Sequence, residues 1–181
     1  MSQPTEAPNR SRTITWEDPV ASAGRGRALS GLDYLRAMMA GEIPPPPIAQ
    51  TLGMYPVEVE YGRAVFEAHP AEFHYNPIGV VHGGLAATML DSATGCAVQA
   101  TLPAGVGYTT IELKTNFVRA ITRDTGRILC DAEIVHRGGT IATAQGRLYA
   151  EAGGKLLAHG LSTCLIVDPG RNGHGARSPE G

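Results

Sequence analysis

The chain has 181 residues, of which 43 % are hydrophobic and 18 % are charged, and its formal net charge is −2 at pH 7. This length fits one domain with some tail left over. The near-neutral charge argues against a nucleic-acid-binding protein, which needs a basic face. No apolar run approaches the roughly 20 residues of a membrane helix, and the first dozen residues lack the apolar core of a signal peptide. We therefore expect a cytoplasmic protein.

The N-terminal quarter reads as an extension that precedes the main domain. Residues 1 to about 29 are polar and rich in Pro, Ser, Gly and Arg, which predicts a mobile or loosely draped segment. A short amphipathic helix is expected at about 30–41, where Ser30 can cap its start and Gly41 can end it. The predicted division is an extension over 1–45, a domain over 46–168 and a disordered tail over 169–181.

The rest of the chain alternates strand-like runs with one long apolar helix. Residues 57–61 and 63–68 alternate apolar and polar side chains around Gly62, which predicts a hairpin. A helix over about 82–101 is apolar nearly all round and should be buried. Four further runs have turn residues between them and predict an antiparallel meander. They are residues 107–119, 127–136, 141–150 and 156–167.

This order of elements predicts an α+β fold in which an antiparallel sheet wraps around a long central helix. A single copy would leave one sheet edge open, and exposed edges promote association. A dimer with a continued sheet is the natural completion.

The most informative stretch is residues 76–93. It places His82, Gly83 and Gly84 at the predicted start of the central helix, with the lone acid Asp91 nine residues after the histidine. A helix N-terminus offers unpaired N–H groups and a positive dipole end, which suit a developing oxyanion. An acid on the same helix adds a base or nucleophile, so the pattern indicates acyl-transfer chemistry.

The stretch resembles the hotdog-fold acyl-CoA thioesterases, within the phenylacetate-pathway branch of the 4-hydroxybenzoyl-CoA thioesterase superfamily. The resemblance covers roughly residues 48–167. Its most specific part is a set of spaced residues: Asn76, Gly79, His82, Gly83, Gly84, Asp91 and Ser92. It implies hydrolysis of an acyl-CoA to a free acid and CoA, without a metal or a redox cofactor.

The resemblance also implies roles for individual residues. The backbone N–H of Gly83 would bind the thioester carbonyl, and Asp91 would be the general base or the nucleophile. Asn76 and His82 would position the thioester end, and the hydroxyl of Thr110 would orient water, with Thr109 as a rival. The remaining candidates would contact substrate or CoA: Gly84, Ser92, Arg137 and Gly138.

Helix geometry adds an inference that does not depend on the family. Gly83 and Asp91 are eight residues apart, which is roughly 12 Å along a helix, whereas donor and nucleophile must each lie about 3 Å from the reacting atoms. One helix cannot place both around one carbonyl. If both act, Asp91 of one subunit faces Gly83 of another, so we predict an obligate homo-oligomer with two shared sites per dimer, either a dimer or a dimer of dimers.

Two other functions share this fold. One is hydration of enoyl thioesters, which typically pairs an aspartate with a histidine that follows at a short spacing, and no histidine follows Asp91 in that way. The other is non-catalytic binding of acyl-CoA. The three cysteines, Cys96, Cys130 and Cys164, lie in apolar contexts without a C-x-x-C pair, so we expect reduced thiols and no metal site.

Overall fold

The computed structural model describes residues 10–172, and most of the predicted disordered tail lies outside this range. Five helices occur in the described range: α1 (Pro19–Gly26), α2 (Gly31–Met39), α3 (Pro47–Leu52), α4 (Gly83–Gln99) and the short α5 (Pro169–Asn172). The strands are β1 (Met54–Glu60), β2 (Arg63–Ala68), β3 (Gly107–Phe117), β4 (Ile128–Arg137), β5 (Ile141–Ala150) and β6 (Leu156–Val167). Short 3-10 turns lie at Glu72–His74, Arg123–Thr125 and Ala152–Gly154.

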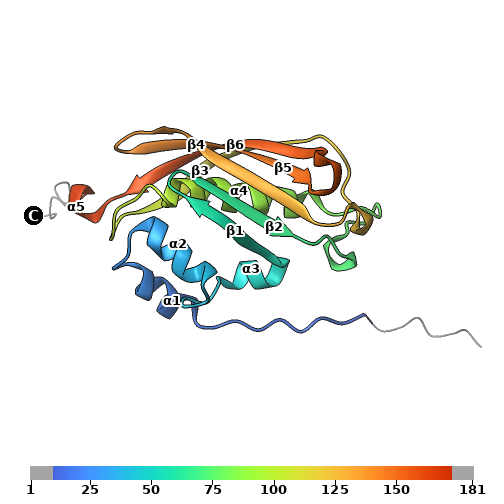
Figure 1. The fold of residues 1–181 in the computed structure, drawn as a ribbon, viewed down its shortest axis with the longest axis horizontal. Coiled ribbons are helices and arrows are strands. Elements are labelled where there is room, and N and C mark those ends of the chain that lie inside the picture. Colours follow the sequence, from blue (N-terminus) through green and yellow to red (C-terminus); the bar gives the residue numbers. More distant parts are fainter. Residues whose placement is uncertain (1–9, 173–181) are drawn as a thin grey trace, which may run out of the picture.

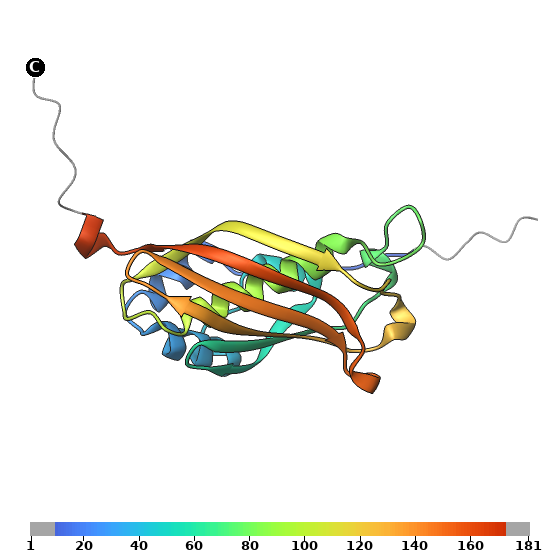
Figure 2. The same ribbon diagram turned by 90° about the horizontal axis from the view of Figure 1, so that it is seen from above.

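The six strands form one antiparallel sheet in the order β1-β2-β4-β5-β6-β3, and the sheet curves over α4 (Figures 1 and 2). This architecture confirms the predicted α+β fold, but the prediction of a four-strand meander is wrong. Strands β4, β5 and β6 are joined as hairpins, whereas β3 pairs with β6 at the far edge. Residues 118–127 connect β3 to β4, and this connection is longer than a hairpin turn, which allows β3 to lie apart from its successor.

Helix α4 fills the concave side of the sheet because its apolar residues cover most of its circumference. Met89, Leu90 and Ala93 are fully buried against the strands. The sheet approaches closely at Gly146, where a Cβ atom would lie 3.0 Å from Cδ2 of Leu90. The hydroxyl of Thr94 donates to the Leu90 carbonyl oxygen at 2.7 Å, so this buried polar group is satisfied within the helix.

The N-terminal extension lies against the side of α4 that the sheet leaves open (Figure 1). As predicted, Ser30 caps α2: its hydroxyl accepts a hydrogen bond from the N–H of Asp33. The α2 start is pinned to the end of α4, because Gly31 donates its N–H to the Leu102 carbonyl oxygen at 2.9 Å. A side chain at Gly31 would overlap the backbone carbonyl of Gln99, so this contact requires glycine.

Helix α1 was not predicted, although its start carries a recognisable signal. Asp18 accepts a hydrogen bond from the N–H of Val20 at 2.9 Å, and Pro19 occupies the first helical position. An acidic N-cap followed by proline is typical of helix starts. The expectation of a loosely draped segment therefore fails between residues 19 and 26, where a helix forms.

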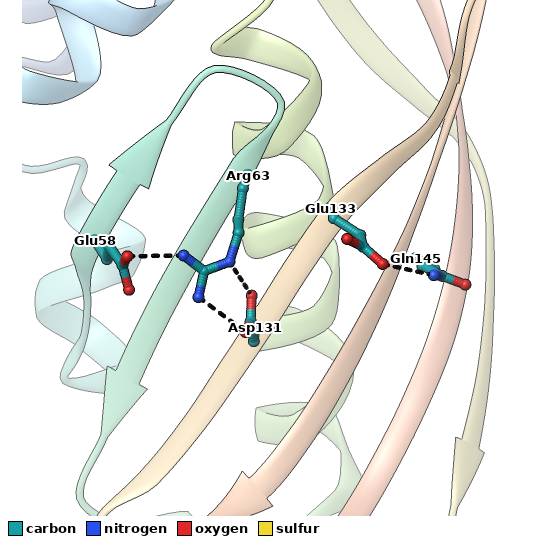
Figure 3. Close-up of polar contacts among 5 residues, drawn as sticks. All are labelled: Glu58, Arg63, Asp131, Glu133 and Gln145. Atoms are coloured by element: carbon teal, nitrogen blue, oxygen red, sulfur yellow. Dashed lines mark hydrogen bonds and ion pairs between the residues drawn. The ribbon is translucent and has the colours of Figure 1, made fainter.

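The outer face of the sheet carries charged and amide side chains that pair across neighbouring strands. The guanidinium of Arg63 donates two hydrogen bonds to Asp131, at 2.9 and 3.0 Å, and one to Glu58 at 2.7 Å (Figure 3). Gln145 donates to Glu133 at 2.9 Å across the next strand pair. These contacts span β1, β2, β4 and β5, and the side chains of Arg63, Glu58 and Asp131 are partly exposed to solvent.

The edge strand β3 differs from this charged part of the outer face. It runs for 11 residues and pairs with β6 alone among the described strands. Two of its large apolar side chains are exposed, Ile111 at 56 % and Phe117 at 61 %. A long, apolar and unpaired edge is a surface that a second chain can extend. Among the described residues, no helix is long and apolar enough to cross a membrane.

Candidate active site

The loop before α4 is shaped by Asn76. Its side-chain oxygen accepts hydrogen bonds from the N–H groups of Ile78 at 3.1 Å and Val80 at 3.3 Å. Gly79 adopts a left-handed conformation with φ of 82°, which suits glycine in this tight loop. Asn76 therefore holds the loop that delivers His82 to the helix start, and its amide oxygen is already engaged.

His82 caps α4. Its Nδ1 atom accepts a hydrogen bond from the N–H of Gly84 at 2.8 Å, so the neutral ring carries its proton on Nε2. A Cβ atom at Gly84 would lie only 2.8 Å from the same Nδ1 atom, so the cap requires glycine there. The N–H of Gly84 is thus used in the cap. The same hydrogen bond fixes the orientation of the exposed His82 ring and of its Nε2–H.

Unlike the N–H of Gly84, the N–H of Gly83 has no hydrogen-bond acceptor in the described chain. Because Gly83 is the first residue of α4, this N–H also lacks an intrahelical partner. A Cβ atom at Gly83 would lie 3.1 Å from the Phe117 ring, which covers this end of the helix. The N–H of Gly83 is therefore the donor that this helix end leaves available for a ligand oxygen.

Asp91 meets the predicted hydroxyl group. Oγ1 of Thr110 donates to Oδ1 of Asp91 at 2.9 Å, whereas Thr109 is exposed. Thr88, an alternative partner on the same helix, donates instead to the carbonyl oxygen of Gly84 at 2.8 Å. The strand after the helix thus brings Thr110, and not its neighbour, to the carboxylate.

A β-bulge sets which residues of β3 face α4. The register shifts between Thr110 and Glu112, so one extra residue, Ile111, is inserted. Because side chains alternate along a strand, Tyr108 and Thr110 share one face, and the inserted residue moves odd-numbered positions onto that face afterwards. This shift allows both Thr110 and Phe117 to face the helix, one at Asp91 and the other at Gly83.

Asp91 and Ser92 also line a cavity of about 810 Å³ between α4 and the N-terminal extension. The phenol of Tyr108 packs against Gly95 and lines this cavity. Burial, together with nearby Cys96 and other groups, raises the pKa of Tyr108 well above its usual value. Burial and the Asp91 carboxylate raise the pKa of Cys96 to about 12. Both groups are therefore neutral at physiological pH.

Within one chain, Gly83 lies far from two of the other predicted site residues, Asp91 and Arg137. Along α4, eight residues separate Gly83 from Asp91, which is about 12 Å. Arg137 is the last residue of β4, at the edge of the β4–β5 turn, and donates to the carbonyl oxygen of Gly138 at 2.9 Å. The sheet register places this turn at the end of the sheet where β3 begins, with β6 between them. Phe117, at the other end of β3 next to Gly83, is about 25 Å away along the strand direction.

Sequence reasoning did not identify Phe117, Tyr108 or Cys96 as part of this region. Tyr108 carries a usable signal, because it lies two residues before Thr110 and so shares its face. Phe117 carries none, because only the bulge turns it toward Gly83. Within the described range, no group of three or more His, Cys, Asp or Glu side chains could hold a metal ion, and the three cysteines are free.

The sequence has recognisable relatives. The profile of the Thioesterase superfamily matches residues 78–157. Human acyl-coenzyme A thioesterase 13 is 31 % identical over 103 residues, which span 56 % of this chain and 71 % of the human protein. A protein of Halobacterium salinarum that is named as an esterase is 39 % identical over 69 residues, which span 37 % of this chain and 44 % of that protein.

Solved structures agree with the sequence relatives. A phenylacetic acid degradation-related protein from Ralstonia eutropha is 32 % identical with a TM-score of 0.66, and the match covers 73 % of this chain and 98 % of that one. A thioesterase family protein from Silicibacter pomeroyi is 25 % identical with a TM-score of 0.66, covering 74 % and 96 %. The antiparallel sheet around α4 and the matched relatives agree: the chain belongs to the Thioesterase superfamily and is a hotdog-fold thioester hydrolase.

Proposed function

We propose that the protein hydrolyses an acyl-CoA to a free carboxylic acid and CoA, with Asp91 as its general base or nucleophile. The observation that carries this proposal is the 2.9 Å hydrogen bond from Thr110 to Asp91 at the wall of an apolar cavity. A carboxylate held by one hydroxyl and open to such a cavity can act on a thioester carbonyl. The similarity to acyl-coenzyme A thioesterase 13 supports CoA as the thiol portion.

The chemistry requires three groups. Asp91 takes a proton from water, whose oxygen attacks the thioester carbon, or attacks that carbon itself and is regenerated by water. The N–H of Gly83 binds the resulting oxyanion, which is worth on the order of 3 kcal/mol of barrier. The C–S bond then breaks and CoA leaves as a thiolate, which is protonated as it departs. In this proposal the Nε2–H of His82 lies near this sulfur, and the cap that Nδ1 makes with Gly84 holds the ring.

The site is shared between two subunits in this proposal. The roughly 12 Å between Gly83 and Asp91 prevents both from reaching one carbonyl within a chain. Ala87, Thr88 and Asp91 lie on a stripe of α4 that remains only half-buried, which leaves it available to a partner helix. The exposed edge of β3 supplies a second contact, where two copies can continue the sheet across a two-fold axis.

The phosphates of CoA would reach the β4–β5 turn of a neighbouring copy. Arg137 lies about 25 Å from Gly83 in its own chain, so its proposed phosphate contact belongs to an assembled dimer or dimer of dimers. Asn76 has a positioning role in the loop, and Ser92, Gly84 and Gly138 remain predicted substrate contacts. The relationship to the phenylacetate-pathway branch and the cytoplasmic location are parts of the same proposal.

The Asp91→Asn variant tests the carboxylate. We expect it to stay folded, to bind CoA and to lose at least roughly a hundredfold in kcat, because a positioned base contributes 10²–10⁴-fold. The assay is release of the CoA thiol from a panel of acyl-CoAs. Full activity of a folded Asp91→Asn protein would refute the assignment.

Mixed dimers test the shared site. Asp91→Asn and Gly83→Pro each disable one half-site, and equal amounts can exchange subunits by mild unfolding and refolding. A mixed dimer then contains one site with both defects and one intact site, so about a quarter of wild-type activity should return. Self-contained sites would give no recovery, because each chain of every dimer would still carry a defect.

A further inference from the structure

We propose that the N-terminal extension forms the distal wall of an acyl-chain pocket, so that the preferred substrates carry medium or long aliphatic chains and Leu29 limits their length. This inference rests on the proposed function for the position of the thioester, at Asp91. It assigns a role to residues that precede the matched family region, which begins at residue 78.

The pocket is built on one face of α4. Asp91, Ser92, Cys96 and Gln99 all line the cavity of about 810 Å³. Their spacing places them on one side of the helix, and Asp91 and Gln99 are about 12 Å apart along its axis. The cavity therefore extends as a channel from the carboxylate toward the end of α4.

The opposite wall comes from the extension and is apolar. It includes Leu29, which precedes α2, Met38 of α2, and Ile48 and Ala49 of α3. Away from Asp91, the charged and amide side chains of the lining are Arg27 and Gln99, and Gln99 lies where the start of α2 contacts the end of α4. Between these ends the lining suits a hydrocarbon chain, which makes no hydrogen bonds.

The volume favours a long chain over a small acyl group. A methylene group occupies about as much space as a water molecule, roughly 30 Å³, so a dodecanoyl chain needs roughly 350 Å³. Ligands usually fill most of the pocket that recognises them. Of the cavity volume of about 810 Å³, a dodecanoyl chain would fill somewhat less than half and an eight-carbon phenylacetyl group roughly 30 %, so the longer aliphatic chain occupies more of the cavity along its length.

Leu29 stands at the far end of this channel. Two backbone hydrogen bonds flank it and tie its segment to the residues that follow α4: Gly105 donates to the Arg27 carbonyl oxygen at 3.0 Å, and Gly31 donates to that of Leu102 at 2.9 Å. Its position is therefore fixed relative to Asp91. A larger side chain here shortens the channel, and a smaller one lengthens it.

Two substitutions of opposite size test the inference. In Leu29→Trp we expect kcat/KM for dodecanoyl-CoA to fall at least roughly tenfold, while that for butanoyl-CoA changes less than about twofold, because each displaced methylene loses about fourfold. In Leu29→Ala the preferred chain should become longer. Ala28→Trp is the matched control, since Ala28 is exposed and does not line the cavity.

Binding of dodecyl-CoA, a thioether that cannot be hydrolysed, separates this inference from the proposed function. Calorimetry should show weaker binding to Leu29→Trp than to Ala28→Trp, whatever the catalytic activity. If dodecyl-CoA binds more weakly to Leu29→Trp than to Ala28→Trp but no acyl-CoA is hydrolysed, the proposed function is wrong and the assignment of the acyl-chain pocket is supported. If acyl-CoAs are hydrolysed with the same chain-length profile in all variants, or phenylacetyl-CoA is preferred throughout, the pocket assignment is wrong.

Discussion

Replacing Gly83 with proline removes one hydrogen-bond donor at a position where proline is compatible with the helix. Proline is favoured at the first position of a helix, where the missing N–H has no intrahelical partner. The preceding residue, His82, has φ of −62° and ψ of 134°, which is the conformation that a residue before proline prefers. The Gly83→Pro protein should therefore fold with α4 intact.

The matched control is Gly83→Ala. Both variants add a Cβ atom about 3.1 Å from the Phe117 ring, and this ring is exposed enough to move. Alanine keeps the N–H and proline removes it, so the ratio of the two activities isolates the donor. Both also restrict the unfolded chain, so neither should unfold more easily than the wild type by more than about 1 kcal/mol.

The expected ratio follows from the chemistry of oxyanion binding. Loss of one donor costs about 10²–10³-fold in kcat, so Gly83→Pro should be at least roughly a hundredfold slower than Gly83→Ala in thiol release from octanoyl-CoA. Circular dichroism and the elution volume verify that both variants are folded and equally assembled. If Gly83→Pro retains more than about a third of the Gly83→Ala rate, the N–H of Gly83 does not bind the oxyanion.

Three further perturbations probe the site and its frame. Thr110→Val should lower kcat at least roughly tenfold because it removes the hydroxyl bound to Asp91, whereas Thr109→Val should be nearly silent; equal losses in steady-state kinetics would exclude the assigned role. Leu90→Ala, at a fully buried position, should cost about 2–5 kcal/mol in chemical unfolding at fixed protein concentration, and a loss below about 1 kcal/mol would contradict the packing described. Burial lowers the pKa of His74, whose Nδ1 accepts from the Ala71 N–H, so its stabilisation is present above the unfolded-state value of 6.5 and is lost as the pH falls below it. The melting temperature should drop between pH 7 and pH 5, and an equal drop in His74→Gln would assign the effect to other groups.

The local features of the site could be predicted because each depends on short-range spacing. The helix start at Gly83 follows from the glycine pair after His82, and the contact of Asp91 with Thr110 needs only one helix and the next strand. The family resemblance favours Thr110 over Thr109, but residue spacing alone does not decide between them, because the choice depends on which face of β3 meets α4. The register across the sheet decides this face.

The order of the strands in the sheet could not be predicted from the sequence. Turn residues predict where strands begin and end, but they do not specify which strand lies next to which. Strand β3 pairs with β6, the last strand, because the ten-residue connection over residues 118–127 allows it to leave its sequence neighbour. The same pairing places a bulge at Ile111, without which Phe117 would face away from Gly83.

The two adjacent glycines of the motif have different physical reasons to be glycine. Gly84 must lack a Cβ because His82 folds back to accept its N–H, and this cap fixes the proton of the ring on Nε2. Gly83 lies one residue earlier, where its N–H has no acceptor in the described chain and the Phe117 ring leaves little room. Capping by His82 therefore uses the N–H of Gly84 and leaves free the N–H of Gly83, the donor that the proposed mechanism assigns to the substrate oxygen. Because α4 carries this open donor about 12 Å from Asp91, the helix presents both halves of a thioester site but cannot combine them by itself. In the proposed dimer, a second copy related by a two-fold axis would supply the missing half to each site.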